Sequence, residues 1–177
     1  MWNSISTIDV LLHNPTLKYI ILFQILRENE SISNFSAFLA TPDNITWGLE
    51  SRNTMIRVIA RGSGKSTYLE NRSPGAAMNP FLGLAGTVAA GMDGIRNKLE
   101  LSAEGPLENE YGKLPGSLEE ALQALENDEV MVESLGPEFV DWFGRVKRDE
   151  LCSIQRNTEL NGGDGFKAEF DFYSRWI

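Results

Sequence analysis

The sequence predicts an α+β fold in which an antiparallel β-hairpin packs with several α-helices. Residues 54–60 and 66–72 are rich in β-branched and aromatic side chains, as strands are. The Gly-containing segment 61–65 joins them at hairpin length. Helical apolar spacing and helix start signals dominate the chain after residue 78. The 177 residues correspond to about one domain.

The first helix after the hairpin is predicted to begin at Asn79-Pro80 and to extend to about Lys98. Asn is a favourable N-cap, and Pro is tolerated at the first helical position. This segment contains four glycines, each of which costs about 1 kcal/mol relative to Ala inside a helix. We interpret them as a packing requirement, because small residues allow another backbone to approach closely.

The other elements follow from capping and breaking signals. Ser117 with Glu120 three residues later forms a capping box at the start of a helix. Gly136-Pro137 ends another helix. The remaining predictions, in chain order, are a helix over 17–27, a loop over 31–44, a loop over 100–116, helices over 118–125, 130–135 and 138–156, a flexible break over 161–165 and an aromatic tail over 166–177.

Composition argues against several classes of function. The formal net charge is −9, and residues 100–150 alone hold 14 acidic and 4 basic side chains. Nucleic-acid binding needs clustered Lys and Arg, so we expect no nucleic-acid partner. A single Cys152 cannot form an internal disulfide, which is typical of a reducing compartment. A single His13 leaves too few ligands for most zinc sites, and we interpret it as an ordinary exposed or capping residue.

No segment resembles a membrane span or a targeting signal. The apolar run over 19–26 is eight residues long, whereas a spanning helix needs about 20. The N-terminus lacks the basic opening of a secretory signal. We therefore expect a cytoplasmic protein with no membrane partner.

Gly64-Lys65-Ser66 resembles the end of a phosphate-binding loop, but its context differs. Such a loop has a second Gly five positions earlier and a helix directly afterwards. Ile59 occupies the earlier position here, and the residues that follow alternate as a strand does. The segment is therefore interpreted as the tip of the hairpin.

A charged cluster on the predicted hairpin carries the functional argument. Tyr68, Glu70 and Arg72 alternate along one strand and so share a face of the sheet. The neighbouring strand region carries Arg52 and Arg57. Guanidinium groups hold phosphate or carboxylate, and a carboxylate binds a hard cation, so these residue types suit a phosphorylated substrate with a divalent metal. The alternative is a salt-bridged sheet face without such a role.

The motifs around this cluster have a recognisable order. They are Ser-Arg-Asn-Thr-Met-Ile-Arg-Val at 51–58, Glu-Asn-Arg-Ser-Pro-Gly at 70–75 with Asn-Pro-Phe at 79–81, Ala-Ala-Gly-Met-Asp-Gly-Ile at 89–95, and Leu-Pro-Gly-Ser-Leu-Glu-Glu-Ala-Leu at 114–122. In this order they resemble the C-terminal portion of the glutamine synthetase catalytic domain. The resemblance predicts a divergent N-terminal segment over 1–45, a partial catalytic domain over 46–156 and a flexible C-terminal tail over 157–177.

The resemblance implies roles for four residues. Glu70 matches a metal-ligand Glu of the family, and Arg72 matches the Arg that holds glutamate. Arg52 and Arg57 match arginines that face the nucleotide phosphates and the phosphorylated intermediate, and so count as catalytic. The implied reaction is ATP-dependent ligation of ammonia to glutamate, with ATP and Mg²⁺ or Mn²⁺ as cofactors. The family also implies homo-oligomers.

This sequence departs from the family pattern in ways that affect the activity. Tyr68 stands where the family usually has an Arg, and Gly75 stands where an Asp is usual. Residues 1–45 lack the family's remaining metal-binding carboxylates. We therefore expect this chain to be too incomplete to catalyse ligation alone. The alternative is a non-enzymatic structural or chaperone-type role like that of the lengsin branch, with cytoskeletal proteins as partners.

Overall fold

A computed structural model describes residues 44–60, 68–73, 78–99, 104, 114–160 and 162–174 of the chain. The elements in this part are β1 (Trp47–Leu49), β2 (Ile56–Ile59), β3 (Tyr68–Asn71), α4 (Pro80–Asn97), α5 (Leu118–Glu126), α6 (Glu129–Leu135), α7 (Pro137–Leu160) and α8 (Gly165–Tyr173). The predicted α+β fold class is confirmed. The helix expected over 17–27, the hairpin tip, His13 and Gly75 lie outside the described residues.

The strands form one sheet in the order β1-β2-β3. β2 and β3 pair antiparallel with Arg57 opposite Glu70, as the predicted hairpin requires. β1 was not predicted as a strand, and it pairs parallel to β2. Two adjacent parallel strands usually need a crossover connection of a dozen or more residues. Here the short loop over residues 50–55, which we call the return loop, connects β1 to β2.

The return over 50–55 folds tightly against β1 at Gly48. A Cβ atom on Gly48 would lie 2.9 Å from Ser51 Cβ and 3.1 Å from Thr54 Cγ2. The fully buried Thr54 hydroxyl donates to the Ile56 carbonyl over 3.1 Å. Met55 N donates to Thr46 Oγ1 over 3.2 Å. The sheet therefore holds the return loop in one position.

Helix α4 begins where the sequence predicts. The Asn79 side chain accepts from the backbone N–H groups of Phe81 and Leu82, and Pro80 is the first helical residue. The helix ends at Asn97, and Lys98 adopts a left-handed φ of 50° as the C-cap. All four glycines of α4 are buried, as is Ala90. This burial agrees with the packing interpretation of the glycines.

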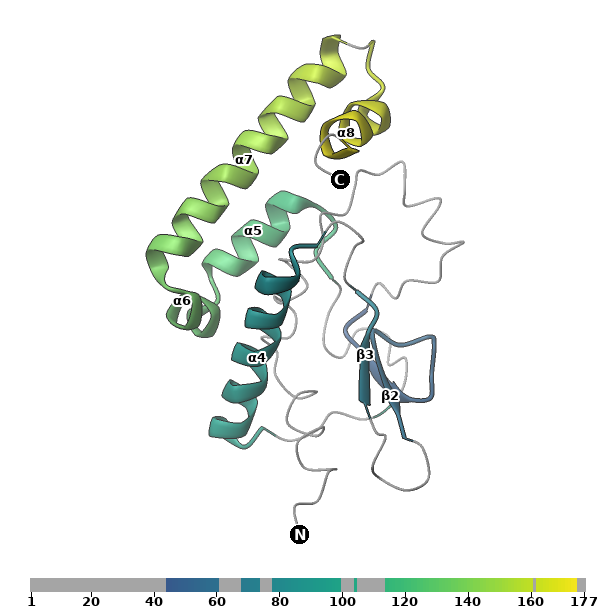
Figure 1. The fold of residues 1–177 in the computed structure, drawn as a ribbon, viewed down its shortest axis with the longest axis vertical. Helices are drawn as coiled ribbons and strands as arrows, with labels where there is room; N and C mark the ends of the chain where they lie inside the picture. The colour runs from purple at the N-terminus through teal and green to yellow at the C-terminus, as the bar shows by residue number, and fades with distance from the viewer. Residues whose placement is uncertain are drawn as a thin grey trace.

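Helices α5, α6 and α7 stand on one side of α4, and the strands stand on the other (Figure 1). One core connects these layers, because buried side chains from the sheet and from all four helices belong to a single cluster. Its members are Met55, Ile56, Ala90, Ala121, Leu122, Leu125, Met131, Val140 and Phe143.

The predicted capping box at Ser117 is present in a modified form. Ser117 Oγ accepts from Glu120 N over 3.2 Å, as expected. The Glu120 carboxylate accepts from Gly116 N over 2.8 Å, one residue earlier than the usual reciprocal contact. Both contacts satisfy backbone donors at the start of α5.

Arg148 joins α7 to α5 through two carboxylates. Its Nη1 lies 2.6 Å from Glu126 Oε1, and its Nη2 lies 3.1 Å from Glu119 Oε1. The hydrogen bonds from Arg148 hold the pKa of Glu119 below its ordinary value. They also raise the pKa of Arg148 itself. The pair of bridges fixes the crossing of the two helices.

The C-terminal region differs from its prediction, which had no regular structure after residue 156. Helix α7 continues to Leu160, and α8 occupies most of the predicted aromatic tail. Asp164 caps α8 by accepting from Lys167 N over 3.0 Å, and Ala168 is buried. Tyr173 donates from its hydroxyl to Glu150 on α7 over 3.2 Å. Among the helices of the described part, none is long and apolar enough to cross a bilayer.

Candidate functional site

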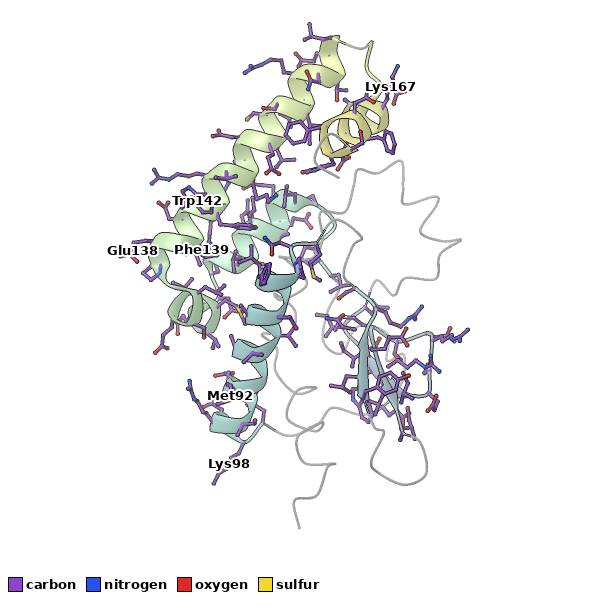
Figure 2. The ribbon with its side chains drawn as sticks, viewed as in Figure 1. Met92, Lys98, Glu138, Phe139, Trp142 and Lys167 are labelled. Atoms are coloured by element: carbon purple, nitrogen blue, oxygen red, sulfur yellow. The ribbon has the colours of Figure 1, made fainter. Side chains whose placement is uncertain are left out.

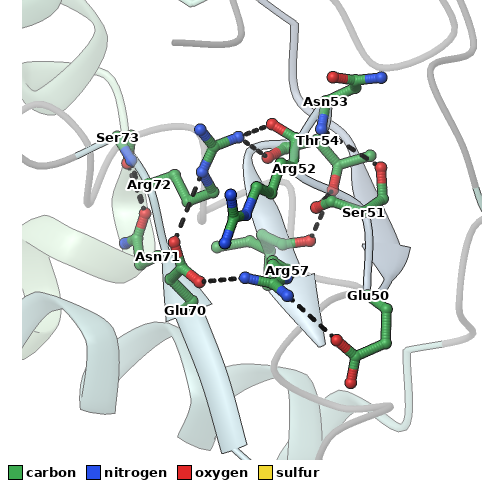
Figure 3. A network of polar contacts seen from close by, with 11 residues as sticks. Glu50, Ser51, Arg52, Asn53, Thr54, Arg57, Glu70, Asn71, Arg72 and Ser73 are labelled. Carbon is green, nitrogen blue, oxygen red and sulfur yellow. Dashed lines mark hydrogen bonds and ion pairs between the residues drawn. The ribbon is translucent and has the colours of Figure 1, made fainter. Parts of the chain in front are cut away.

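Glu70 lies at the centre of the site and contacts two arginines. Its Oε2 accepts from Arg57 Nη1 over 3.2 Å, and its Oε1 lies 3.5 Å from Arg72 Nε. Arg57 faces Glu70 because the two residues are direct cross-strand partners in the antiparallel pair. Arg72 follows directly after β3 and shares the parity of Glu70. Both contacts are drawn in Figure 3.

A second carboxylate, Glu50, holds the other end of the Arg57 guanidinium. Glu50 Oε2 lies 3.0 Å from Arg57 Nη2. Glu50 Oε1 accepts from Ala60 N over 3.2 Å. Glu50 adopts a positive φ of 53° at the beginning of the return loop. Sequence reasoning missed this residue, since no strand or helix period places a loop carboxylate next to β2.

Arg72 connects β3 to the return loop. Its backbone N–H donates to the Met55 carbonyl over 2.9 Å. Its Nη1 donates to the carbonyl of Arg52 and lies 3.4 Å from the carbonyl of Thr54. Only 15% of the Arg72 side chain is exposed. Arg72 therefore fixes the loop segment that carries Arg52.

The structure brings all four predicted site residues together. Arg52 is exposed on the return loop and lies beside Arg57 and Arg72 (Figure 3). The cluster contains these three guanidinium groups and the carboxylates of Glu50 and Glu70, so its formal charge is positive. We call these five residues the arginine cluster.

The donor set of the arginine cluster suits an anion better than a cation. Arg57 Nε is buried and has no hydrogen-bond partner within the described part of the chain. Both oxygens of Glu70 face guanidinium groups, so a metal would have to compete with Arg57 and Arg72. Within the described residues, no group of three or more His, Cys, Asp or Glu side chains is arranged to hold a metal. The arrangement can hold phosphate or carboxylate, and the described residues do not complete a metal site.

Tyr68 begins β3 and is half exposed. It pairs with Ile59 across the sheet, two residues along the strand from Glu70. The phenol adds a neutral hydroxyl where the family resemblance places a positive charge. The cluster therefore carries one guanidinium fewer than that pattern implies.

The fold agrees with the comparison against known families. The family model described as "Glutamine synthetase, catalytic domain" matches residues 30–161. The chain belongs to the glutamine synthetase family. The resemblance drawn from the sequence motifs is thereby confirmed. The sequence motifs predicted a partial catalytic domain over residues 46–156. The family model matches a longer range, which begins before residue 46 and ends after residue 156.

This chain matches only part of the length of each relative. Type-1 glutamine synthetase 2 of Dictyostelium discoideum is 37% identical over 62% of this chain and 22% of its own length. Human lengsin is 38% identical over 66% of this chain and 24% of its own length. The solved GmaS/ADP complex has a TM-score of 0.66 at 26% identity, covering 85% of this chain and 37% of that chain. This chain thus spans about a quarter of the length of these two curated relatives.

Proposed function

We propose that this chain carries the arginine-bearing part of a glutamine synthetase active site. Arg52 and Arg57 would contact the phosphates of ATP and of the phosphorylated intermediate, and Arg72 would contact the glutamate substrate. The observation that supports this proposal most is the ion-pair chain Glu50–Arg57–Glu70–Arg72, with Arg52 exposed beside it. The reaction of the complete domain would be ATP-dependent ligation of ammonia to glutamate.

The electrostatics support anion binding at this place. Phosphoryl transfer is accelerated by fixed positive groups that neutralise charge on the phosphate oxygens. The two carboxylates hold the Arg57 fork in place before any ligand arrives, so little side-chain entropy is lost on binding. Arg52 is free to turn towards an incoming anion, because it is exposed.

Glu70 remains the proposed metal ligand for Mg²⁺ or Mn²⁺, with one condition. Both of its oxygens face arginines here, so it would have to release at least one of them. The further ligands would have to come from outside the described residues. A divalent metal, when bound, would supply additional positive charge at the phosphates.

We therefore expect the purified chain to form no glutamine from glutamate, ammonia and ATP. The assay measures glutamine and ADP together, with Mg²⁺ and with Mn²⁺, against an intact glutamine synthetase as positive control. Glutamine formation that disappears in a Glu70→Ala variant would contradict the expectation of inactivity. It would also support the metal role of Glu70.

Anion binding is tested separately from turnover. We expect ATP to bind weakly in isothermal titration calorimetry, and Arg52→Ala to reduce its affinity about tenfold, since hydrogen bonds to charged groups contribute about 1.5–3 kcal/mol. The matched control is Arg145→Ala, because Arg145 is 76% exposed and pairs with Asp141 one turn away. Equal effects of both variants would refute a specific role for the arginine cluster.

A lengsin-like role is the second candidate, and the identity to human lengsin together with Tyr68 favours it. In that case the chain would act as a non-enzymatic structural or chaperone-type protein with cytoskeletal partners. Co-sedimentation with assembled cytoskeletal filaments tests this candidate directly. Filament binding that persists in Arg52→Ala, with no ATP binding by the unaltered chain, would favour this role over the first.

A further inference from the structure

The Glu50 carboxylate occupies a position that suits an anion. Its Oε2 lies 3.0 Å from Arg57 Nη2, and its Oε1 accepts from the backbone N–H of Ala60 over 3.2 Å. The contact with Arg57 is drawn in Figure 3. A guanidinium edge and a backbone N–H bind the oxygens of a carboxylate, and they bind the oxygens of a phosphate in the same way. We call Arg57 Nη2 and Ala60 N together the Arg57 anion position.

The backbone at Glu50 is unusual for a residue with a side chain. Its φ of 53° lies in the left-handed region, which Gly adopts readily and other residues adopt rarely. Within the described residues, Lys98 is the other non-Gly residue with a positive φ, and it is the C-cap of α4. Glu50 instead lies between two strands. Residues in this conformation persist where their contacts fix them, and they are concentrated at ligand sites. Here those contacts are with Arg57 and Ala60.

Glu50 is also the carboxylate of the arginine cluster that is held more loosely. Its side chain is 48% exposed and lies on the return loop. Glu70 lies on β3 directly opposite Arg57, and its two oxygens face two guanidinium groups. The backbone N–H of Glu50 donates to the Val58 carbonyl over 2.8 Å. The Glu50 side chain can therefore turn into solvent while its backbone stays paired and Glu70 still holds Arg57.

A phosphate that reaches Arg57 has to exchange with one of these carboxylates. Nη1 of Arg57 is occupied by Glu70, and Nη2 is occupied by Glu50. The Arg57 side chain is 18% exposed, and its Nε is buried. Phosphate and the Glu50 carboxylate carry charges of the same sign, so they repel each other at close range. Binding at Nη2 therefore requires that the Glu50 side chain leaves.

We propose that the Glu50 carboxylate is an internal competitor for the Arg57 anion position, and that a phosphate binds Arg57 by displacing it. This inference deepens the proposed function, because it rests on the arginine cluster being an anion site and adds a residue that weakens binding there. The alternative is that Glu50 keeps holding Arg57 when the ligand is bound. The two cases predict opposite effects, since removing a competitor tightens anion binding and removing a holding group weakens it.

The first test measures the binding of inorganic phosphate to the full chain by isothermal titration calorimetry. The ionic strength is kept constant, because salt screens exposed charges. We expect Glu50→Gln and Glu50→Gly to bind phosphate about three- to tenfold more tightly than the unaltered chain, a modest gain because an exposed ion pair is weak. Gln keeps the size of the side chain, whereas Gly removes it and suits the positive φ. Phosphate affinity that is unchanged or weaker in both variants would overturn the proposal.

The matched control is Glu138→Gln, which removes the same charge at an exposed residue in the first turn of α7. Glu138 lies on the helical side of the molecule, away from the strands (Figure 2). We expect its phosphate affinity to equal that of the unaltered chain. A gain in Glu138→Gln as large as that in Glu50→Gln would show an effect of net charge and would overturn the proposal. Circular dichroism verifies that all variants fold.

A double variant shows whether the gain depends on Arg57. Glu50→Gln should tighten phosphate binding in the unaltered chain but not in an Arg57→Met background, because the group that it releases is Arg57 Nη2. A gain of the same size without Arg57 would also overturn the proposal.

Titration with ATP separates this inference from the proposed function. Tighter phosphate binding in Glu50→Gln, with no effect of Arg52→Ala on ATP binding, would support the competitor and refute the nucleotide role of the arginine cluster. ATP affinity that depends on Arg52, with no gain in either Glu50 variant, would support the nucleotide role and refute the competitor. If neither the unaltered chain nor the Glu50 variants bind phosphate or ATP, both are refuted.

Discussion

Replacing Gly48 with Ala tests how tightly the return loop is held against β1. The added Cβ would lie 2.9 Å from Ser51 Cβ, and 3.1 Å and 3.3 Å from the two side-chain atoms of Thr54. Ser51 Cβ is attached directly to the backbone and cannot rotate away. Because Thr54 is fully buried, its side chain cannot move into solvent either. The loop must therefore shift as a unit.

The expected cost of Gly48→Ala follows from two opposing effects. Overpacking a well-packed site costs typically about 1–3 kcal/mol. Replacing Gly by Ala within a regular element returns roughly 0.5–1 kcal/mol through backbone entropy. We therefore expect a net loss of about 1–2 kcal/mol in the free energy of unfolding. For a chain of this size that loss lowers the melting temperature by roughly 2–8 °C.

The assay is thermal and urea unfolding followed by circular dichroism, with Gly116→Ala as the matched control. A Cβ on Gly116 would lie 3.6 Å from Glu120 Oε2, an ordinary contact. Gly48→Ala should also weaken ATP binding, because the loop carbonyls that accept from Arg72 would move. If Gly48→Ala unfolds at the same temperature as Gly116→Ala, the close packing of the return loop is refuted.

Three further predictions concern other parts of the molecule. Asp128 is buried, its Oδ2 has no hydrogen-bond partner among the residues that the structure describes, and burial is the main reason that its pKa is raised. The contribution of Asp128 to stability should fall as pH rises from the ordinary Asp pKa through the raised pKa of the folded state. Asp128→Asn should therefore flatten that part of the curve of unfolding free energy against pH, measured by urea titrations. An unchanged slope in the variant would refute the raised pKa of Asp128. Arg148→Met should cost about 1 kcal/mol near neutral pH, and it should remove the Glu119 contribution to stability that is otherwise lost as pH falls below the ordinary Glu pKa. Arg145→Met should cost almost nothing in the same denaturation assay. Equal stability losses for Arg148→Met and Arg145→Met would show that the two ion pairs between α5 and α7 do not stabilise the fold more than an exposed pair within one helix does. Tyr68→Arg should tighten ATP binding in calorimetry several-fold without changing the melting temperature, because Tyr68 is half exposed; weaker binding would count against an anion site.

The elements that sequence reasoning placed well are those whose signals are local. Asn79 and Ser117 each cap a helix through backbone N–H groups two or three residues away, so the signal and the structure lie in the same few residues. The hairpin is similar, because its two strands are neighbours in sequence. Local signals of this kind also gave α6 within one residue of its start.

The elements that were missed depend on contacts between separate segments. β1 is only three residues long, and its pairing with β2 rests on the return loop packing at Gly48. Nothing in the strand pattern marks such a parallel partner. Helix α8 was overlooked because the glycines before it indicate a break, while its cap, Asp164, lies among them. Glycine-rich composition concealed a helix start.

The arginine cluster was predicted only in part. The alternation of residues along β3 predicted which side chains share a face of the sheet, but it could not predict which carboxylate contacts which arginine. Glu50 and Glu70 each bind one terminal nitrogen of Arg57, so that guanidinium is held largely by the protein itself. Arg72 is mostly buried and is occupied by Glu70 and the loop carbonyls. Arg52 is therefore the residue best placed to meet an incoming anion first, and Arg57 and Arg72 would have to exchange part of their present contacts to bind the phosphates and glutamate. Removing Arg52 should cost affinity alone, whereas removing Arg57 should also leave two carboxylates without their shared partner and reduce stability.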